Sequence, residues 1–195
     1  MKLVGLTGGI GSGKTTVATV FESLSIPVFN SDLAARALLA EDEKVVHSVI
    51  NLLGADAYHP DGSPDRKRIA QLVFTDPPLL NALNAIIHPA VRQSTLQWIE
   101  SLPDSVDYCI KEAAILFESG AAAQCDQVVV VTARTDVRIE RIMARDDVSR
   151  GDVEERMNNQ WPQEKIAGMA DFCIENNPEQ SLIQQVLDVH NALSA

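Results

Sequence analysis

Short apolar runs alternate along the chain with longer segments in which apolar residues recur at helical spacing. The first run spans residues 2–7, and after a glycine-rich stretch the apolar positions between 17 and 24 recur as on one face of a helix. Continuous apolar strands separated by helices are typical of a parallel sheet covered on both faces, so the pattern predicts an α/β fold. The later apolar runs lie at residues 26–29, 106–110, 128–131 and 172–174.

The connections between these predicted strands differ greatly in length. Roughly 75 residues separate the second run from the third, which is far more than a crossover needs, and they contain several helical patterns. We predict a helical insertion over residues 57–103 that packs beside the sheet and forms a substrate wall. Residues 135–169 are charged and have helical spacing, which predicts a mobile lid. The core is then expected to comprise residues 1–56, 104–134 and 170–195.

Composition and charge restrict the partners of the protein. The 195 residues suffice for one buried core, and 27 Asp and Glu outnumber 16 Lys and Arg, for a formal net charge of -11. This charge repels nucleic acid and anionic membrane surfaces, so neither is an expected partner. The chain has no apolar run of about 18 residues and no signal peptide, which predicts a cytoplasmic location. We expect a monomer, and the sequence leaves an oligomer open.

The cysteines and histidines follow no metal-binding pattern. Cys109, Cys125 and Cys173 are odd in number, widely spaced and mostly in apolar surroundings, which indicates reduced core thiols rather than disulfides or a zinc site. The four histidines lack an HExxH-type pairing. Any metal is therefore expected to arrive with a ligand.

The glycine-rich stretch after the first predicted strand carries the strongest chemical signal. Residues 8–15, GGIGSGKT, fit the pattern G-x-x-x-x-G-K-[ST], and the predicted strand and helix on either side supply the context that this motif requires. Glycines let backbone N–H groups turn inward around phosphate oxygens, and the following helix adds the positive end of its dipole. The alternative is a glycine-rich turn with a surface lysine. A dinucleotide-binding fold is disfavoured because G-x-G-x-x-G is absent.

The polar side chains of this loop have expected roles in binding a nucleoside triphosphate. Lys14 is expected to reach the β- and γ-phosphates, Thr15 to bind the accompanying Mg²⁺, and Thr16 to contact the donor nearer the α-phosphate. A switch GTPase should show an NKxD-type motif after a later strand, where this chain reads VVVVTARTD, so that class is disfavoured. The residues expected to bind ATP through the loop are Gly9, Gly11, Ser12, Gly13, Lys14, Thr15 and Thr16.

Two further charged residues follow the second predicted strand. Asp32 lies at the carboxyl end of that strand, where ligands bind in such folds, and there it either accepts a proton from an acceptor hydroxyl or caps a helix. Arg36 follows one turn later and either meets an anionic substrate or is solvated.

Four arginines of the predicted lid recur at spacings of 4, 3 and 4, which predicts one basic stripe on a helix. In an acidic protein such a stripe is a candidate phosphate clamp. Its alternative is a solvated face balanced by nearby carboxylates. The four are Arg134, Arg138, Arg141 and Arg145.

Taken in order, the motifs of this chain resemble the dephospho-CoA kinase family. The matching segments are LTGGIGSGKTTVA, SDLAAR, DRKRIAQLVF, LNAIIHPAVR, ILFESG, ERIMARD, VSRGDVEERMNNQ and ADFCIENN. Members of that family are P-loop kinases with a five-stranded parallel core, a helical substrate domain and a lid. They phosphorylate the ribose 3′-hydroxyl of dephospho-CoA with ATP. The resemblance implies this fold, this reaction, and Mg²⁺ bound with ATP.

The resemblance also implies roles for individual residues around the donor. Asp32 corresponds to an aspartate that the family carries as general base. Arg141 and Arg145 match the pattern ERxxxR and are expected to close on the triphosphate, whereas Arg134 and Arg138 lack this support. Asn176 corresponds to a family position near the adenine.

On the acceptor side, the pattern HPxxR is matched by His88, Pro89 and Arg92. The resemblance implies that His88 and Arg92 line the acceptor pocket, the alternative being a role in capping and packing. The proline is expected to start a helix.

The chain departs from the family pattern at two places. Asn30-Ser31-Asp32 stands where the family commonly has Asp-Ala-Asp, so the resemblance implies no supporting carboxylate at position 30. The strand before ILFESG often carries aspartate and proline in the family, whereas this chain reads IKEAAILFES. Glu112 then either contacts Mg²⁺ through a water or pairs with Lys111 or another basic group.

Two other functions remain compatible with the loop itself. A nucleoside monophosphate kinase or another small-molecule kinase shares the loop and the lid but needs a different acceptor wall. A nucleotide-dependent regulatory protein binds ATP without transferring its phosphate to a small molecule. Incubation with ATP, Mg²⁺ and a panel of acceptors separates these alternatives.

Overall fold

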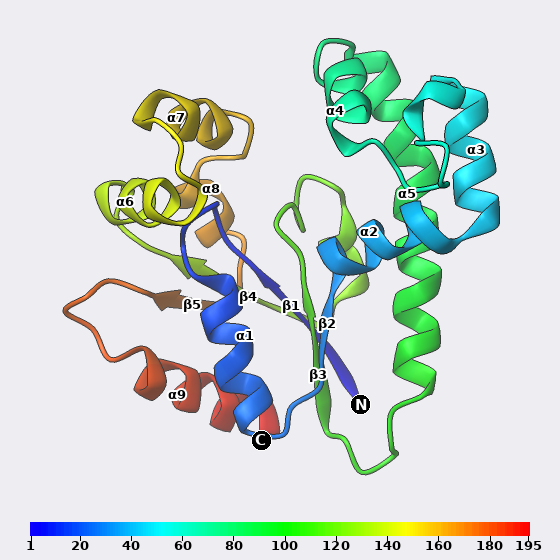
Figure 1. Ribbon diagram of the computed structural model, residues 1–195. Helices are drawn as coiled ribbons and strands as arrows, with labels where there is room; N and C mark the ends of the chain where they lie inside the picture. The colour runs from blue at the N-terminus through cyan, green and yellow to red at the C-terminus, as the bar shows by residue number, and fades with distance from the viewer. The chain divides into compact units, whose positions relative to one another are not determined.

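Five parallel strands organise the first of two units into which the structure divides. The computed structural model describes residues 1–195, and their contacts separate Met1–Asn30 with Leu102–Ala195 from Ser31–Ser101. The strand order across the sheet is β2-β3-β1-β4-β5, as Figure 1 shows for the first unit. The strands are β1 (Lys2–Thr7), β2 (Val28–Asn30), β3 (Tyr108–Glu112), β4 (Gln127–Thr132) and β5 (Phe172–Glu175).

The central strand β1 sets the register of its two neighbours. It pairs in parallel with β3, where Leu6 lies opposite Glu112, and with β4, where Thr7 lies opposite Val130. β3 and most of β4 are buried on both faces, which explains why these strands read as continuous apolar runs in the sequence. The predicted α/β fold with a five-stranded parallel sheet is confirmed.

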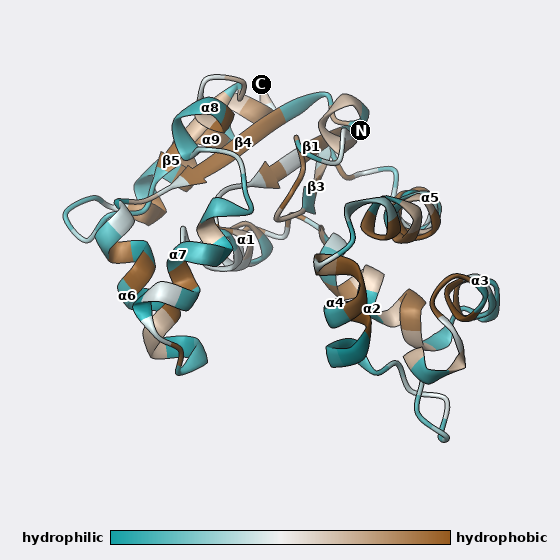
Figure 2. Ribbon diagram, turned by 90° about the horizontal axis from the view of Figure 1, so that it is seen from above, coloured by the Kyte–Doolittle hydropathy of each residue, from teal (hydrophilic) through white to brown (hydrophobic).

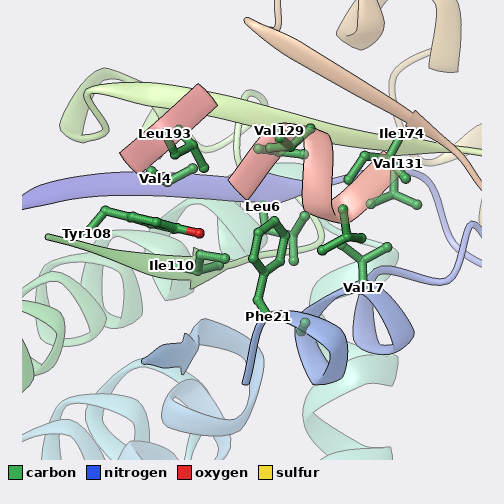
Figure 3. Close-up of a cluster of buried hydrophobic side chains, with 13 residues drawn as sticks. Val4, Leu6, Val17, Phe21, Tyr108, Ile110, Val129, Val131, Ile174 and Leu193 are labelled. Carbon is green, nitrogen blue, oxygen red and sulfur yellow. The ribbon is translucent and has the colours of Figure 1, made fainter. Parts of the chain in front are cut away.

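One face of the sheet is covered by α1 (Lys14–Ser23) and α9 (Leu182–Ser194). Their apolar residues form one buried cluster with side chains from four strands, drawn in Figure 3. Phe21 of α1 is fully buried there, and its ring meets Tyr108 edge-on at a centroid distance of 6.5 Å. This packing holds α1, and with it the glycine-rich loop before α1, against the centre of the sheet.

The opposite face is covered by α8 (Gln163–Ala167) and by the segment between β3 and β4, which includes the 3-10 helix η2 (Ala121–Gln124). Leu116 from this segment and Ile166 from α8 pack with Val130 of β4 in a second buried cluster. Both faces of β4 are therefore enclosed.

Two further helices of the first unit, α6 (Thr135–Asp146) and α7 (Arg150–Asn158), form a small core of their own. Figure 2 shows that they alternate between hydrophobic and hydrophilic residues, as expected for helices buried on one face. Ser149 and Asp152 form a capping box that starts α7. These helices, with α8, make up the segment predicted as a lid.

The second unit is entirely helical and is built around its longest helix, α5. The helices α2, α3 and α4 all pack against α5, so the unit begins at Ser31 and is longer than residues 57–103. The assignment of residues 57–103 as a substrate insertion and the role of this unit in holding an acceptor stay predictions. Its elements are α2 (Ser31–Glu41), α3 (Glu43–Leu53), η1 (Ala55–Ala57), α4 (Arg66–Phe74) and α5 (Pro77–Glu100).

The expectation that Pro89 starts a helix is wrong. Pro89 lies inside α5, which begins twelve residues earlier at Pro77, where Asp76 accepts a hydrogen bond from the Leu79 N–H. A proline within a helix removes one backbone hydrogen bond, so the sequence alone favours a break there. The helix continues because buried residues on one face, both before and after the proline, hold it in place. They are Leu83, Ile87, Val91 and Thr95.

The three cysteines differ in exposure. All three cysteines are free; Cys109 is buried, Cys125 is half-buried, and Cys173 is exposed rather than in the core. Burial raises the pKa of the Cys109 and Cys125 thiols to about 11, which keeps both protonated near neutral pH.

None of the helices combines the length and apolar character needed to cross a membrane.

Candidate active site

The glycine-rich loop connects β1 to α1, and its glycines are required by its backbone and its neighbours. Gly11 and Gly13 have φ angles of 79° and 93°, which lie in the left-handed region that residues with a side chain rarely adopt. A Cβ atom at Gly13 would collide with the Asn176 amide, and one at Gly9 would collide with the Arg138 guanidinium. The loop therefore lies directly against side chains of the lid segment and of the segment after β5.

The backbone carbonyl groups of this loop are bound by side chains. The donors are two arginines of α6, the lysine of the motif itself, and the asparagine after β5. Such bonds fix the direction of each peptide group, so the N–H groups face the other way. The contacts are Lys14 Nζ to Gly8 O (2.7 Å) and Gly9 O (3.4 Å), Arg138 Nε to Ile10 O (2.9 Å), Arg141 Nη1 to Gly11 O (3.5 Å) and Ser12 O (3.4 Å), and Asn176 Nδ2 to Ser12 O (2.8 Å).

Several backbone N–H groups at the start of α1 are left without an acceptor in the chain. The N–H of Ser12 donates to Gly9 O, and that of Ile10 donates to the Gln160 side chain, but those of Gly11, Gly13, Thr15 and Thr16 donate to no other group. Unpaired N–H groups at a helix N-terminus, joined by the helix dipole, form a site for anions such as phosphate. The loop has the geometry of a phosphate site.

A cavity of about 230 Å³ opens at this loop. Loop residues and two arginines of α6 line it, so backbone N–H groups and positively charged side chains lie around the same cavity. Most of the nucleotide residues predicted from the sequence line this cavity, whereas Gly9 and Ser12 belong to the loop but not to the lining. Asn176 lies beside the lining through its bonds to Ser12 and Arg141. The lining residues are Gly11, Gly13, Lys14, Thr15, Thr16, Arg141, Ile142 and Arg145.

The four arginines of the predicted stripe differ in burial and in partner, and their role as a phosphate clamp stays a prediction. Arg138 is only 6% exposed and lies behind the loop, and burial lowers the pKa of its guanidinium. Arg134 is exposed at the start of α6 and pairs with Glu179, 2.9 Å away. Only Arg141 and Arg145 face the cavity, because the helix packs its buried face against the loop.

Arg145 is held by an ion pair at the end of α6. Its Nε lies 2.7 Å from Asp146 Oδ1, and Arg156 Nη1 of α7 lies 2.8 Å from Asp146 Oδ2. The hydrogen bond from Arg145 lowers the pKa of Asp146 to about 2, with Arg156 acting in the same direction. Asp146 therefore stays charged at neutral pH and competes for the Arg145 guanidinium.

A buried carboxylate lies beside the loop at the end of β3. Glu112 is 5% exposed; its Oε1 accepts from Thr15 Oγ1 at 3.3 Å, and its Oε2 accepts from Asn30 Nδ2 at 2.8 Å. The neighbouring Lys111 donates to Gln124 Oε1 at 3.2 Å. Asn30, the departure noted in the sequence, thus orients Glu112 toward Thr15.

These oxygen atoms fit a magnesium ion that is bound together with a nucleotide. Mg²⁺ prefers hard oxygen ligands, retains several waters, and is usually held by one or two side chains plus phosphate oxygens. The Thr15 hydroxyl and the Glu112 carboxylate supply such oxygens at the edge of the phosphate loop. No group of three or more His, Cys, Asp or Glu side chains suited to a metal is present.

The residues predicted for the acceptor lie in the second unit. Asp32 and Arg36 are exposed on the first turns of α2, and on α5 His88 is half-buried and Arg92 is exposed. The spacing of four residues in each pair places its members on one helix face. A groove of about 720 Å³ between α2, α3 and α5 is lined by none of the four.

Two residues with contacts to the site, Gln160 and Asn30, carry no role in the sequence prediction, and Arg138 is expected there only as part of the candidate arginine clamp. Arg138 and Gln160 bind the loop backbone, and Asn30 binds Glu112. Arg138 and Gln160 stand within segments that carry the family resemblance or the arginine spacing, but their partners lie more than a hundred residues away in the chain. Contacts at that separation leave no local pattern.

We expect Gly13→Ala to weaken ADP binding by about tenfold or more, because the new methyl group meets both a disfavoured φ angle and the Asn176 amide. Gly62→Ala is the matched control, since Gly62 has a φ of 85° but no atom within 4 Å of the added Cβ. Calorimetric titration of both variants with ADP measures the difference. Equal ADP affinity in the two variants would contradict this account of the loop.

Comparison with known proteins agrees with the geometry of the site. The sequence profile of the dephospho-CoA kinase family matches residues 2–181. A dephospho-CoA kinase of Chlorobium chlorochromatii is 42% identical over 180 residues, covering 90% of this chain and 85% of that protein. One from Chlorobaculum tepidum is 39% identical, covering 98% and 94%.

Solved structures show the same likeness. A crystal structure of a Thermus thermophilus protein superimposes with a TM-score of 0.87 at 32% identity, covering 98% of this chain and 96% of that one. A dephospho-CoA kinase from Campylobacter jejuni has a TM-score of 0.71 at 25% identity, with the same coverage. The family match spans most of the chain and confirms the resemblance read from the ordered motifs. The chain belongs to the dephospho-CoA kinase family.

Proposed function

We propose that this protein transfers the γ-phosphoryl group of ATP to the ribose 3′-hydroxyl of dephospho-CoA, giving CoA and ADP in the last step of coenzyme A biosynthesis. The observation that supports the proposal is that the N–H groups at the start of α1, Lys14 and Arg141 lie around one cavity. The chain that carries this cavity belongs to the dephospho-CoA kinase family. Positive charge and fixed donors of this kind bind phosphate and stabilise charge during its transfer.

On the donor side, each group around the cavity has a distinct task. The loop N–H groups hold the phosphates, and Lys14 exchanges its bonds to Gly8 and Gly9 for phosphate oxygens. Arg141 and Arg145 balance the charge that develops on the transferring group. Asn176 holds both Ser12 O and Arg141, which supports a role in orienting that arginine. Its place beside the adenine stays a prediction.

Magnesium is the metal that the donor set favours. The Thr15 hydroxyl is the proposed direct ligand, and Glu112 is the proposed acceptor for a metal-bound water. When bound, Mg²⁺ neutralises charge on the donor phosphates. Asn30 then acts by keeping the Glu112 carboxylate turned toward Thr15.

On the acceptor side, Asp32 is the proposed general base. The 3′-hydroxyl oxygen attacks the γ-phosphorus, the bond to the bridging oxygen of ADP breaks, and the hydroxyl proton passes to the Asp32 carboxylate. Arg36, His88 and Arg92 are proposed to hold the anionic acceptor. We propose that the helical unit as a whole binds the acceptor. We propose that residues 135–169 close over the donor as a lid.

The reaction is tested by incubating the protein with ATP, Mg²⁺ and a panel of acceptors, with products identified by mass spectrometry. We expect phosphorylated product from dephospho-CoA and little from AMP or other nucleoside monophosphates. Preferred phosphorylation of a monophosphate would replace the proposed acceptor. ATP binding without transfer to any acceptor would indicate a regulatory protein. The expected monomer and cytoplasmic location stay predictions.

We expect Lys14→Ala to lower turnover by ~10² or more, because the variant loses a positioned charge at the transferring group. Lys2→Ala is the matched control: Lys2 lies at the opposite end of β1, where its Nζ donates to Leu193 O. Steady-state rates and circular dichroism are measured for both. Near-normal transfer by a folded Lys14→Ala protein would remove Lys14 from the mechanism.

Arg141→Ala is also expected to lower turnover by ~10², since Arg141 lines the cavity and bonds the loop. Arg134→Ala is the comparison from the same helix region, because Arg134 pairs with Glu179 on the surface. Arg138→Ala cannot serve as this control, because Arg138 anchors Ile10 O from behind the loop. Equal turnover of the Arg141 and Arg134 variants would show that the clamp is assigned to the wrong residue.

Asp32→Asn should separate binding from chemistry. The amide keeps the shape of the side chain but cannot take a proton, so transfer should fall by ~10² to 10⁴ while ADP affinity is unchanged. Asp42→Asn is the control, because Asp42 caps α3 and asparagine caps equally well. A fully active Asp32→Asn protein would mean that Asp32 helps to start α2 and takes no part in the reaction.

A further inference from the structure

The backbone of Ile10, at the tip of the phosphate loop, is bound by the lid segment through both its N–H and its carbonyl. Its N–H donates to Gln160 Oε1 at 2.7 Å, and its carbonyl accepts from Arg138 Nε at 2.9 Å. Arg138 belongs to α6, and Gln160 follows the end of α7. The backbone donor and the backbone acceptor of this one residue are therefore both occupied by side chains from more than 120 residues away.

The Ile10 side chain adds an apolar contact to these two hydrogen bonds. It packs against Ile139 and Ile142 of α6 and Val153 of α7, which are 1%, 1% and 0% exposed. The tip of the loop thus belongs to the small core of α6 and α7. We call Ile10 with Arg138 and Gln160 the loop anchor.

Gln160 also connects the anchor to the segment that follows β3 and Glu112. Its Nε2 donates to Ala114 O at 3.4 Å, two residues after Glu112, and its own N–H donates to Met157 O at 3.1 Å. The side chain therefore reaches the loop from a fixed backbone and is oriented by a second bond. Such an arrangement is typical of a group that positions another.

We propose that Gln160 is a positioning residue for the nucleotide, which presets the phosphate loop by accepting the Ile10 N–H and keeps that N–H out of the phosphate site. The N–H groups that remain for phosphate are then those between Gly11 and Thr16 that donate to no other group. Without the Gln160 oxygen, the Ile10 N–H loses its acceptor and the loop spends part of its time in other conformations. The apparent affinity for nucleotide falls in proportion to the fraction of competent loop.

The decisive variant is Gln160→Met, which keeps the length of the side chain and removes the acceptor. We expect the Kd for ADP and the KM for ATP to rise by the same factor, about 5- to 100-fold, the range for a partly buried N–H that loses its partner. Because the anchor acts before chemistry, kcat should stay within about threefold and the KM for dephospho-CoA should be unchanged.

Gln163→Met is the matched control. Gln163 is three residues away, and its Oε1 also accepts a backbone N–H, that of Ala133 at 3.0 Å, but it does not contact the loop. Its loss should reduce thermal stability about as much as the loss of Gln160 and leave the Kd for ADP within about twofold. An equal rise in Kd for both variants would mean a general loss of structure and would overturn the proposal.

Two other results would also overturn it. An unchanged Kd for ADP in Gln160→Met removes Gln160 from nucleotide binding, and a fall in kcat at constant KM moves its role to the transition state. A further measurement needs no variant: the Ile10 amide hydrogen of the nucleotide-free protein should exchange slowly with solvent. Rapid exchange would contradict the anchor even if Gln160→Met failed to fold.

This inference rests on the proposed nucleotide site and not on the identity of the acceptor. ADP binding and amide exchange are measured without dephospho-CoA, so failure of the anchor and failure of the proposed reaction give different results.

Discussion

The orientation of the peptide groups between Gly8 and Ser12 is the constraint on which the rest of the site depends. The side chains of Lys14, Arg138, Arg141 and Asn176 donate hydrogen bonds to the loop carbonyls. With the carbonyls held from outside, the N–H groups that follow face the cavity. A free glycine-rich chain has many conformations, so these bonds also reduce the entropy that phosphate binding must overcome.

The parallel sheet is what brings such distant residues together. Because every strand runs in the same direction, the carboxyl ends of all five meet at one edge, where ligands bind in folds of this class. The loop follows β1, Glu112 ends β3, and Asn176 follows β5. The buried cluster of α1, α9 and the sheet keeps these ends in register, and the separate core of α6 and α7 holds the arginines over the loop.

Sequence reasoning succeeds where a local pattern has a local cause. Continuous apolar runs predict β1 and β4 because strands buried on both faces need apolar residues at every position. The phosphate loop is predicted because its glycines and lysine are consecutive. Pro89 is misread because packing along α5 outweighs the lost hydrogen bond. The separate positions of the four arginines are not predicted, because helical spacing does not reveal that Arg138 is buried. The partners of Gln160 and Asn30 depend on long-range contacts and leave no pattern in the chain.

The most direct test of this account is the response of individual loop amides to ADP in solution NMR. We predict that the amide protons of Gly11, Gly13, Thr15 and Thr16 shift strongly downfield, because each gains an acceptor that the free chain does not supply. The Ser12 amide, already bonded to Gly9 O at 3.1 Å, should shift least. ADP binding with the largest shift at Ser12, or with no shift along the loop, would contradict the claim that anchored carbonyls preset a phosphate site.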